Sequence, residues 1–234
     1  MTALNGDAHW NRMWLELTSD LAGKDEQSQV LRTRNKRPID DDTWTHTLRT
    51  VASQMELGPG DRVLDLCCGN GLFSLGFAPL VAGIDAVDIS PQLIAALRAR
   101  NLPNVTAHVS NLCEWQAPEA SFSKVLWYAG IQYFPEAEIV VLLRRIRQWM
   151  RPNGLLFIGD IPDRDKLWDY FNTPERQAAY FDGIARGQRI IGSWLERRWL
   201  EQLCRAAGFA EAHAVPQDPR LIYADFRFDL SART

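Results

Sequence analysis

The sequence reads Val63-Leu64-Asp65-Leu66-Cys67-Cys68-Gly69-Asn70-Gly71 at the point that decides its fold. An apolar run leads into an acid, and a loop with two glycines then opens into the apolar segment 72–75. This order predicts a strand, a tight turn and a helix, the first unit of a doubly wound α/β sheet. A second apolar run, 84–87, ends in Asp88, whose carboxylate can accept hydrogen bonds from both hydroxyls of a ribose. The two features together predict a bound nucleoside.

The glycine pattern narrows the kind of nucleoside. A dinucleotide site needs Gly-x-Gly-x-x-Gly, and Ser74 stands where the third glycine would be. A phosphate-binding Gly-x-x-x-x-Gly-Lys-Ser/Thr loop does not occur in the chain. The stretch instead resembles motif I of the class I S-adenosylmethionine-dependent methyltransferases, Asp/Glu-x-Gly-x-Gly-x-Gly, with Cys67 at the first glycine. A dehydrogenase and an ordinary strand-turn-helix junction are the alternatives.

The resemblance covers about residues 28–230 and implies a fold. It implies a doubly wound, Rossmann-like, seven-stranded sheet with an antiparallel C-terminal edge hairpin and a helical N-terminal extension. We expect residues 1–57 to form that extension and to act as a lid. Residues 58–234 are then the methyltransferase domain, in which an insertion at 162–192 forms a substrate wall.

The resemblance also implies S-adenosylmethionine as cofactor, S-adenosylhomocysteine as product, and a set of cofactor contacts. These come from the motif I region and from the ends of the next strands: Asp65, Cys67, Gly69, Asn70, Gly71, Asp88, Ile89, Asn111, Leu112 and Trp127. Asn111 would offer its carbonyl to the adenine amino group, with a plain turn role as the alternative. Arg32 would bind the methionine carboxylate, because a guanidinium can hold a carboxylate by two hydrogen bonds. The alternative is that the basic run 29–39 is simply solvated.

Candidate catalytic residues follow from the chemistry of methyl transfer. The reaction is an in-line displacement in which the enzyme positions the nucleophile, and a hydroxyl nucleophile gains from a general base. Tyr128 and Tyr133 follow the fourth predicted strand, Asp160 ends the fifth, and His9 lies in the N-terminal helix. The alternative for the two tyrosines is simple stacking, and that for His9 is a surface or core role. Asp160 could bind a polar substrate or a metal. The carboxylates do not form the set that a metal-dependent enzyme needs, so we expect no metal.

Composition sets the remaining expectations. The chain has 234 residues, 46% of them apolar, and a net charge of −3. This predicts a compact protein without the basic surface that nucleic acid or an anionic membrane would require. The four cysteines lack zinc-ligand spacing, and neither a signal peptide nor a membrane span is evident, so a cytoplasmic location is expected. We expect a monomer or a homodimer.

The end of the fourth strand, Trp127-Tyr128-Ala129-Gly130, bears on the substrate. Methyltransferases of nucleic-acid amines carry Asp/Asn-Pro-Pro-Tyr there. We therefore predict methyl transfer to a small molecule, at a hydroxyl oxygen, in secondary-metabolite or sugar biosynthesis. The alternatives are a nitrogen or carbon acceptor, a protein or tRNA methyltransferase, and a non-catalytic regulator or partner subunit that binds the cofactor.

Three local predictions concern element ends. Asp42 or Thr43 is expected to cap the helix that precedes the first strand of the sheet. The segment 193–196, Ser-Trp-Leu-Glu, is typical of a capping box. The last strand is expected over 223–230.

Overall fold

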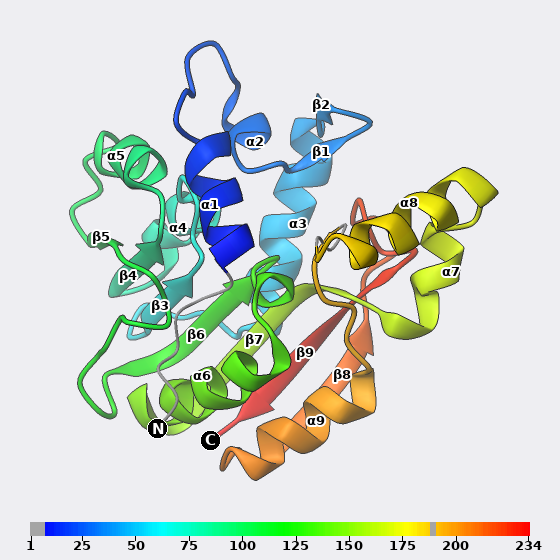
Figure 1. The fold of residues 1–234 in the computed structure, drawn as a ribbon. Helices are drawn as coiled ribbons and strands as arrows, with labels where there is room; N and C mark the ends of the chain where they lie inside the picture. The colour runs from blue at the N-terminus through cyan, green and yellow to red at the C-terminus, as the bar shows by residue number, and fades with distance from the viewer. Residues whose placement is uncertain (1–7, 188–190) are drawn as a thin grey trace.

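The computed structural model describes residues 8–187 and 191–234, and its centre is a seven-stranded sheet (Figure 1). The strand order is β5-β4-β3-β6-β7-β9-β8. The bounds are β3 (Arg62–Leu66), β4 (Gly83–Asp88), β5 (Val105–Val109), β6 (Phe122–Tyr128), β7 (Met150–Pro162), β8 (Glu211–Pro216) and β9 (Arg227–Arg233). Strands β3 to β7 run parallel, and β9 pairs antiparallel with both β7 and β8. The predicted doubly wound sheet with an antiparallel C-terminal edge is confirmed.

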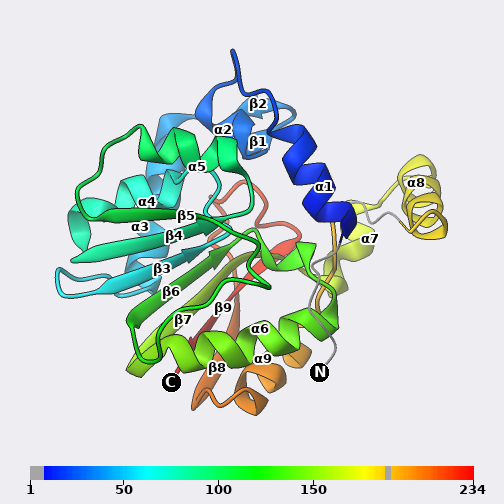
Figure 2. The ribbon, with the colours of Figure 1, turned by 60° about the vertical axis from the view of Figure 1, so that its left-hand side comes forward.

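Helices cover both faces of the sheet (Figure 2). One layer is formed by α3 (Asp41–Gln54), α4 (Leu72–Phe77) with the 3-10 turn η1 (Ala78–Leu80), and α5 (Pro91–Arg98). The other is formed by α6 (Glu136–Trp149) and α9 (Arg197–Ala206). Because side chains alternate along a strand, Val63 packs under the layer of α3, α4 and α5, and Leu64 packs under the layer of α6 and α9. Both are fully buried, as expected for parallel strands covered on two sides.

Two helix starts show how the local sequence sets these elements. The Ser90 hydroxyl accepts a hydrogen bond from the Leu93 N–H at 3.2 Å, with Pro91 in the first helical position. Helix α3 begins after Asp40, whose carboxylate accepts from the Thr43 N–H at 2.8 Å. The prediction of Asp42 or Thr43 as the cap is therefore wrong, because the extended Asp40 already reaches the free N–H of the first turn.

The other two local predictions are also corrected. The segment 193–196 is extended: the Leu195 N–H donates to the Pro162 carbonyl at 2.9 Å, and α9 starts only at Arg197. Pairing with the end of β7 therefore replaces the expected capping box. The last strand begins at Arg227 rather than at 223, because residues 221–226 form turns at the cavity described below.

The remaining segments flank the sheet. The N-terminal part holds α1 (Ala8–Leu17), α2 (Glu26–Gln29) and a short hairpin of β1 (Thr33–Arg34) and β2 (Arg37–Pro38), which was not predicted. The region after β7 holds η3 (Arg164–Lys166), α7 (Leu167–Tyr170) and α8 (Pro174–Ala185). Residues 1–7 of the expected extension and 188–190 of the expected insertion lie outside the described residues. Across the part of the chain that is described, every helix is too short or too polar to cross a membrane.

Candidate active site

A cavity of about 410 Å³ lies where the parallel strands end. Leu66 is in register with Val87, and Tyr128 with Gly159, so the residues that follow each strand meet at one edge of the sheet. The cavity is lined by residues from all five parallel strands or the loops after them, by α1, and by the loops before β1 and β9. Ligands of open α/β sheets bind at this edge.

Asp65 holds the first strand against the helix that follows it. Its carboxylate accepts a hydrogen bond from the Ser74 hydroxyl at 2.6 Å and is 3% exposed. Burial raises the pKa of Asp65 to about 7, and the nearby charge of Asp88 adds to the rise. Asp65 and Gly71 do not line the cavity, since a β-carbon on Gly71 would lie 2.4 Å from the Leu97 side chain. Both residues support the motif I loop without lining the cavity.

Asp88 lines the cavity and organises its floor. One carboxylate oxygen accepts from the Gly69 N–H at 2.8 Å, and the other accepts from the Ser90 N–H at 2.9 Å. Burial raises the pKa of this carboxyl. A carboxylate has about four acceptor positions, so acceptor capacity remains beyond these two hydrogen bonds.

The rest of the motif I loop is tied to the N-terminal segment. The Asn70 amide donates to the Glu26 carbonyl at 2.8 Å and to the Gln29 side chain at 2.9 Å. Its own carbonyl oxygen is buried without a hydrogen-bond partner. Cys67, Cys68, Gly69 and Asn70 all line the cavity, and Cys67 adopts a left-handed backbone with φ of 57°.

Three of the other predicted contacts also line the cavity: Ile89, Asn111 and Leu112. The Asn111 carbonyl accepts from the Cys113 N–H at 3.0 Å, so this side chain has the turn role that was its alternative. Trp127 is fully buried and packs on Phe134 at 5.4 Å between ring centroids, beneath the cavity rather than in its lining.

Arg32 is buried, whereas its neighbours Arg34 and Arg37 are exposed. Its guanidinium lies 4.6 Å from the ring centroid of Tyr128 and 5.6 Å from those of two further aromatic rings, Trp44 and Phe73. Within residues 8–187 and 191–234, it forms an ion pair with no carboxylate. A buried guanidinium without an anion, lining a cavity, is a candidate anion site.

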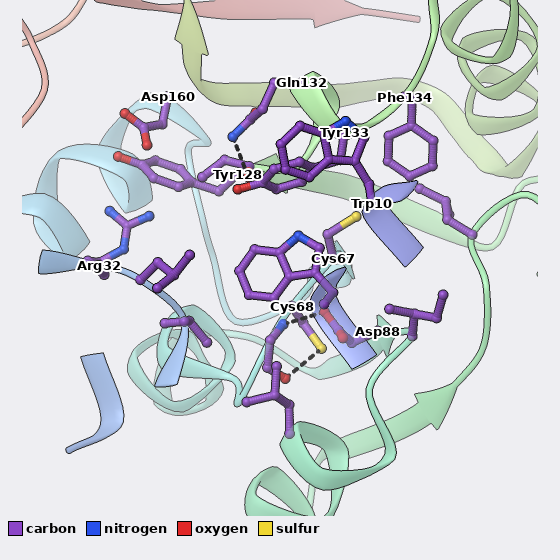
Figure 3. Close-up of a pocket in the computed structure, with 18 of the residues that line it drawn as sticks. Trp10, Arg32, Cys67, Cys68, Asp88, Tyr128, Gln132, Tyr133, Phe134 and Asp160 are labelled. Atoms are coloured by element: carbon purple, nitrogen blue, oxygen red, sulfur yellow. Dashed lines mark hydrogen bonds between the residues drawn. The ribbon is translucent and has the colours of Figure 1, made fainter. Parts of the chain in front are cut away.

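The structure brings Tyr128, Tyr133 and Asp160 together in this cavity but leaves His9 out of its lining (Figure 3). Burial raises the pKa of Tyr128 far above its ordinary value, the charge of Asp160 adds to this, and Arg32 opposes it. Burial also raises the pKa of Tyr133, to about 12. Both phenols therefore remain protonated at neutral pH and can donate a hydrogen bond. His9 packs edge-on against Trp10 at 5.1 Å.

Asp160 sits at an irregularity of β7, where the register with β9 shifts between Ile158 and Ile161. Its backbone is left-handed, with φ of 61°. Both of its backbone polar groups are held by side chains of β9. The Asp160 N–H donates to the Asp229 carboxylate at 2.8 Å, and the Arg227 guanidinium donates to the Asp160 carbonyl at 2.7 Å.

Comparisons with known proteins agree with this geometry. Residues 63–154 match the family model described as a methyltransferase domain. A ubiquinone biosynthesis O-methyltransferase of Xanthomonas campestris pv. campestris is 30% identical over 115 residues, which are 47% of this chain and 47% of that protein. These similarities support the resemblance to the class I S-adenosylmethionine-dependent methyltransferases.

Solved structures of methyltransferases share the fold. An S-adenosylmethionine-dependent methyltransferase from Mesorhizobium loti has a TM-score of 0.62 at 19% identity, over 82% of this chain and 98% of that one. Phosphoethanolamine N-methyltransferase 1 of Haemonchus contortus, solved with phosphoethanolamine and S-adenosylhomocysteine, has a TM-score of 0.70 at 13% identity. That match covers all of this chain and 50% of that one. The chain spans about half the length of the curated relatives it matches.

Several residues at this cavity were missed from the sequence. Arg227, which lines the cavity, and Asp229, which binds the Asp160 N–H, lie 67 and 69 residues beyond Asp160, and neither stands in a motif. The aromatic side chains of Tyr223 and Phe226 also line the cavity. The only available signal was their aromatic or polar character near predicted strand ends. In the described ranges 8–187 and 191–234, no three His, Cys, Asp or Glu side chains are grouped to hold a metal ion.

Proposed function

We propose that this protein transfers a methyl group from S-adenosylmethionine to a hydroxyl oxygen of a small molecule, in secondary-metabolite or sugar biosynthesis. The observation that carries the proposal is the arrangement of the buried charged groups of one cavity. Asp88 stands at the tip of β4, while Arg32 and Asp160 stand on either side of Tyr128 (Figure 3). A nucleoside end and a reacting end are thereby held in one enclosed space.

The residues present fit the cofactor. The free acceptor positions of Asp88 suit the ribose hydroxyls, and Arg32, which has no anion of its own among the described residues, suits the methionine carboxylate. Ile89, Asn111 and Leu112 would flank the adenine, and residues 67–70 the methionine end. Asp65, Gly71 and Trp127 would support this surface from behind.

When bound, S-adenosylmethionine supplies a sulfonium methyl group: the acceptor oxygen bonds to the methyl carbon, the carbon–sulfur bond breaks, and sulfur keeps the electron pair. The residues of the chain orient the acceptor and take its proton. Asp160 accepts that proton, because its carboxylate lines the cavity and receives no hydrogen bond from a described residue. The protonated Tyr128 donates a hydrogen bond that holds the acceptor oxygen in line, and Tyr133 closes the wall beside it. His9 supports Trp10 at the cavity mouth instead of acting on the substrate.

We also propose that residues 1–57 act as the lid and residues 58–234 as the methyltransferase domain, with 162–192 as the substrate wall. Trp10, Trp14 and Arg32 from the first segment and Tyr170 from the insertion line the cavity, which supports this division. A covered site also keeps water away from the reacting atoms.

The test is calorimetric titration of the protein with S-adenosylmethionine and S-adenosylhomocysteine, with NADH as the control, followed by an acceptor screen. Micromolar binding of the first two ligands without NADH binding is expected. Binding of NADH alone, or of none of the three, would contradict the cofactor assignment. Tight cofactor binding without transfer to any hydroxyl, amine or carbon acceptor would identify a cofactor-binding regulator instead.

A further inference from the structure

The bulge on β7 holds one carboxylate toward the cavity at a structural cost. Asp160 is 3% exposed and has a left-handed backbone, a conformation that residues with a side chain rarely adopt. Two buried charged residues of β9, Asp229 and Arg227, bind its N–H and its carbonyl. Gln217 in turn donates to Asp229 at 2.8 Å. No described residue donates to the Asp160 carboxylate itself, so the ligand is the available source of a donor.

Further polar groups without partners surround this carboxylate. Gln132, which is 2% exposed, donates from its amide nitrogen to the Ala129 carbonyl at 2.8 Å, while its own carbonyl oxygen has no hydrogen-bond partner. The Nε of Arg227 also has none. Figure 3 shows Asp160 and Gln132 on one side of Tyr128 and Arg32 on the other. The end of the cavity around Asp160, which would hold the molecule to be methylated, therefore presents both hydrogen-bond donors and hydrogen-bond acceptors.

The buried charges at this end are balanced. Arg32 and Arg227, which are 9% and 7% exposed, are matched in number by two buried carboxylates, Asp160 and Asp229. A charged acceptor would add an uncompensated charge to a buried site, which is costly. An acceptor ammonium would in addition lie near two guanidinium groups and the sulfonium. This balance favours a neutral acceptor.

The walls of this end are aromatic. The rings of Tyr170 and Phe226 are 4.7 Å apart, and Tyr223 lies 5.6 Å from Phe226. All three line the cavity. Aromatic walls with a few convergent polar groups suit a ring whose faces are apolar and whose edges carry polar groups.

We infer that the acceptor is a neutral saturated ring carrying several hydroxyl groups, which is the chemistry of a carbohydrate. Each hydroxyl both donates and accepts a hydrogen bond, so a ring with several of them can match Asp160, Gln132 and the Arg227 guanidinium at once. A phenol with one hydroxyl would leave most of these groups without partners. The inference rests on the proposed function and narrows its substrate.

Saturation-transfer NMR on the full chain, saturated with S-adenosylhomocysteine, tests this inference. The probes are the methyl glycosides of glucose, mannose and rhamnose, with catechol, 4-hydroxybenzoate and tyramine as aromatic, anionic and cationic alternatives. At least one glycoside should bind, and the two charged probes should not. Asp160→Asn should weaken glycoside binding by about tenfold or more, as expected for the loss of a charged hydrogen-bond acceptor.

Two further variants guard against misfolding and unspecific effects. Asp160→Gly removes the carboxylate while suiting the left-handed backbone, so it should fold and show the same loss. Glu56→Gln, on an exposed side chain that pairs with Arg233, should bind the glycoside as the wild type does. Absence of glycoside binding, preference for catechol or a charged probe, or unchanged binding in both Asp160 variants would overturn the inference. Failure to bind S-adenosylhomocysteine in the first place would instead contradict the proposed function.

Discussion

Cys67 lies against Gly130 so closely that a β-carbon on the glycine would come within 2.9 Å of the Cys67 Cβ and 3.0 Å of its Sγ. Cys67 stands where the family pattern has its first glycine, and Gly130 follows β6 on the other side of the same loop. The Cys67 side chain, which stands at the first glycine of motif I, thus fits because Gly130 has no side chain. The backbone of Gly130, with φ of −117°, would permit alanine, so the restriction is one of space alone.

Gly130→Ala should therefore destabilise the protein and weaken cofactor binding. The new methyl group must displace Cys67 or Trp127, whose Nε1 would lie 2.8 Å away, at a cost of about 1–3 kcal/mol for an overpacked core. Urea unfolding and calorimetry with S-adenosylhomocysteine measure the two effects. Adding Cys67→Gly should restore part of the stability.

The matched control is Gly83→Ala, where the nearest atom to a β-carbon is the Asn104 carbonyl oxygen at 3.7 Å. This variant should be far less destabilised. Equal stability of Gly130→Ala and the wild type would show that the loop moves freely and that the contact has no consequence.

Asp65 should make the protein less stable as the pH rises. Its pKa in the folded state is about 7, against an ordinary value of 3.8, so the folded state binds the proton more tightly than the unfolded chain. Its contribution is fully present below about pH 4 and is lost as the pH rises to about 7, at about 1.4 kcal/mol for each pH unit between the two pKa values. Asp65→Asn keeps an oxygen for the Ser74 hydroxyl and removes this titration. The free energy of unfolding of the variant minus that of the wild type should therefore increase between pH 5 and pH 8, and a constant difference would contradict the raised pKa.

Sequence patterns predicted the sheet well because each parallel strand is buried on both faces and therefore appears as an apolar run. The run 63–66 and the start of α5 at Ser90-Pro91 are local signals that tertiary contacts do not override. The capping box predicted at 193–196 is wrong for the opposite reason, because a tertiary contact overrides the local signal. The segment carries a helix-start pattern, but two backbone hydrogen bonds of Leu195 hold it extended beside the end of β7: its N–H donates to the Pro162 carbonyl at 2.9 Å, and its carbonyl accepts from the Arg164 N–H at 3.0 Å.

The candidate site was predictable where a motif or the end of a predicted strand indicates it. Asp88 and residues 67–70 follow from the first two strands, and all of them line the cavity. Arg227 and Asp229 were missed because they act through the backbone of Asp160 from a strand that is distant in sequence. His9 and Trp127 were nominated from chain position alone, and the packing of His9 on Trp10 and of Trp127 on Phe134 removes both from the lining.

Asp88→Ala should weaken S-adenosylmethionine binding by about 1–3 kcal/mol, the range for the loss of a charged hydrogen-bond partner. Part of that loss arises because the Gly69 N–H loses its acceptor. Asp88→Asn keeps an acceptor oxygen and should lose less. Calorimetry gives the affinities, with Asp85→Ala as the control, since Asp85 is engaged by Arg62 and His108 away from the cavity. Unchanged affinity in Asp88→Ala would show that the ribose assignment is wrong.

Tyr223→Phe should loosen the hairpin that carries Arg32 toward the cavity. The Tyr223 hydroxyl donates to the Thr33 carbonyl at 2.6 Å, and losing this bond costs about 0.5–1.5 kcal/mol. Hydrogen exchange of residues 31–40 should become faster, and affinity for S-adenosylhomocysteine should fall. Tyr180→Phe is the matched control, because the Tyr180 ring packs on Phe171 at 4.8 Å in the region after β7. Exchange in Tyr223→Phe that is no faster than in the Tyr180→Phe control would mean that the hairpin is held by other contacts.

Tyr128→Phe should reduce turnover without a comparable loss of cofactor affinity. Burial keeps the Tyr128 phenol protonated, so its hydroxyl can donate to the acceptor oxygen, and phenylalanine keeps the ring that lies 4.6 Å from the Arg32 guanidinium. The expected loss in kcat is about tenfold or more, on the scale of one directed hydrogen bond in a buried site. Steady-state kinetics with the acceptor identified by the screen, together with calorimetry, separates the two quantities.

The pH profile tests the donor role of Tyr128. Because the phenol does not titrate near neutrality, Tyr128→Phe should lower kcat at every pH and leave the shape of the profile unchanged. Asp160→Asn removes the proposed base, so it should lower kcat as well. A wild-type kcat in Tyr128→Phe would reduce this tyrosine to a packing residue beside Arg32, and a changed shape of the profile would contradict its donor role.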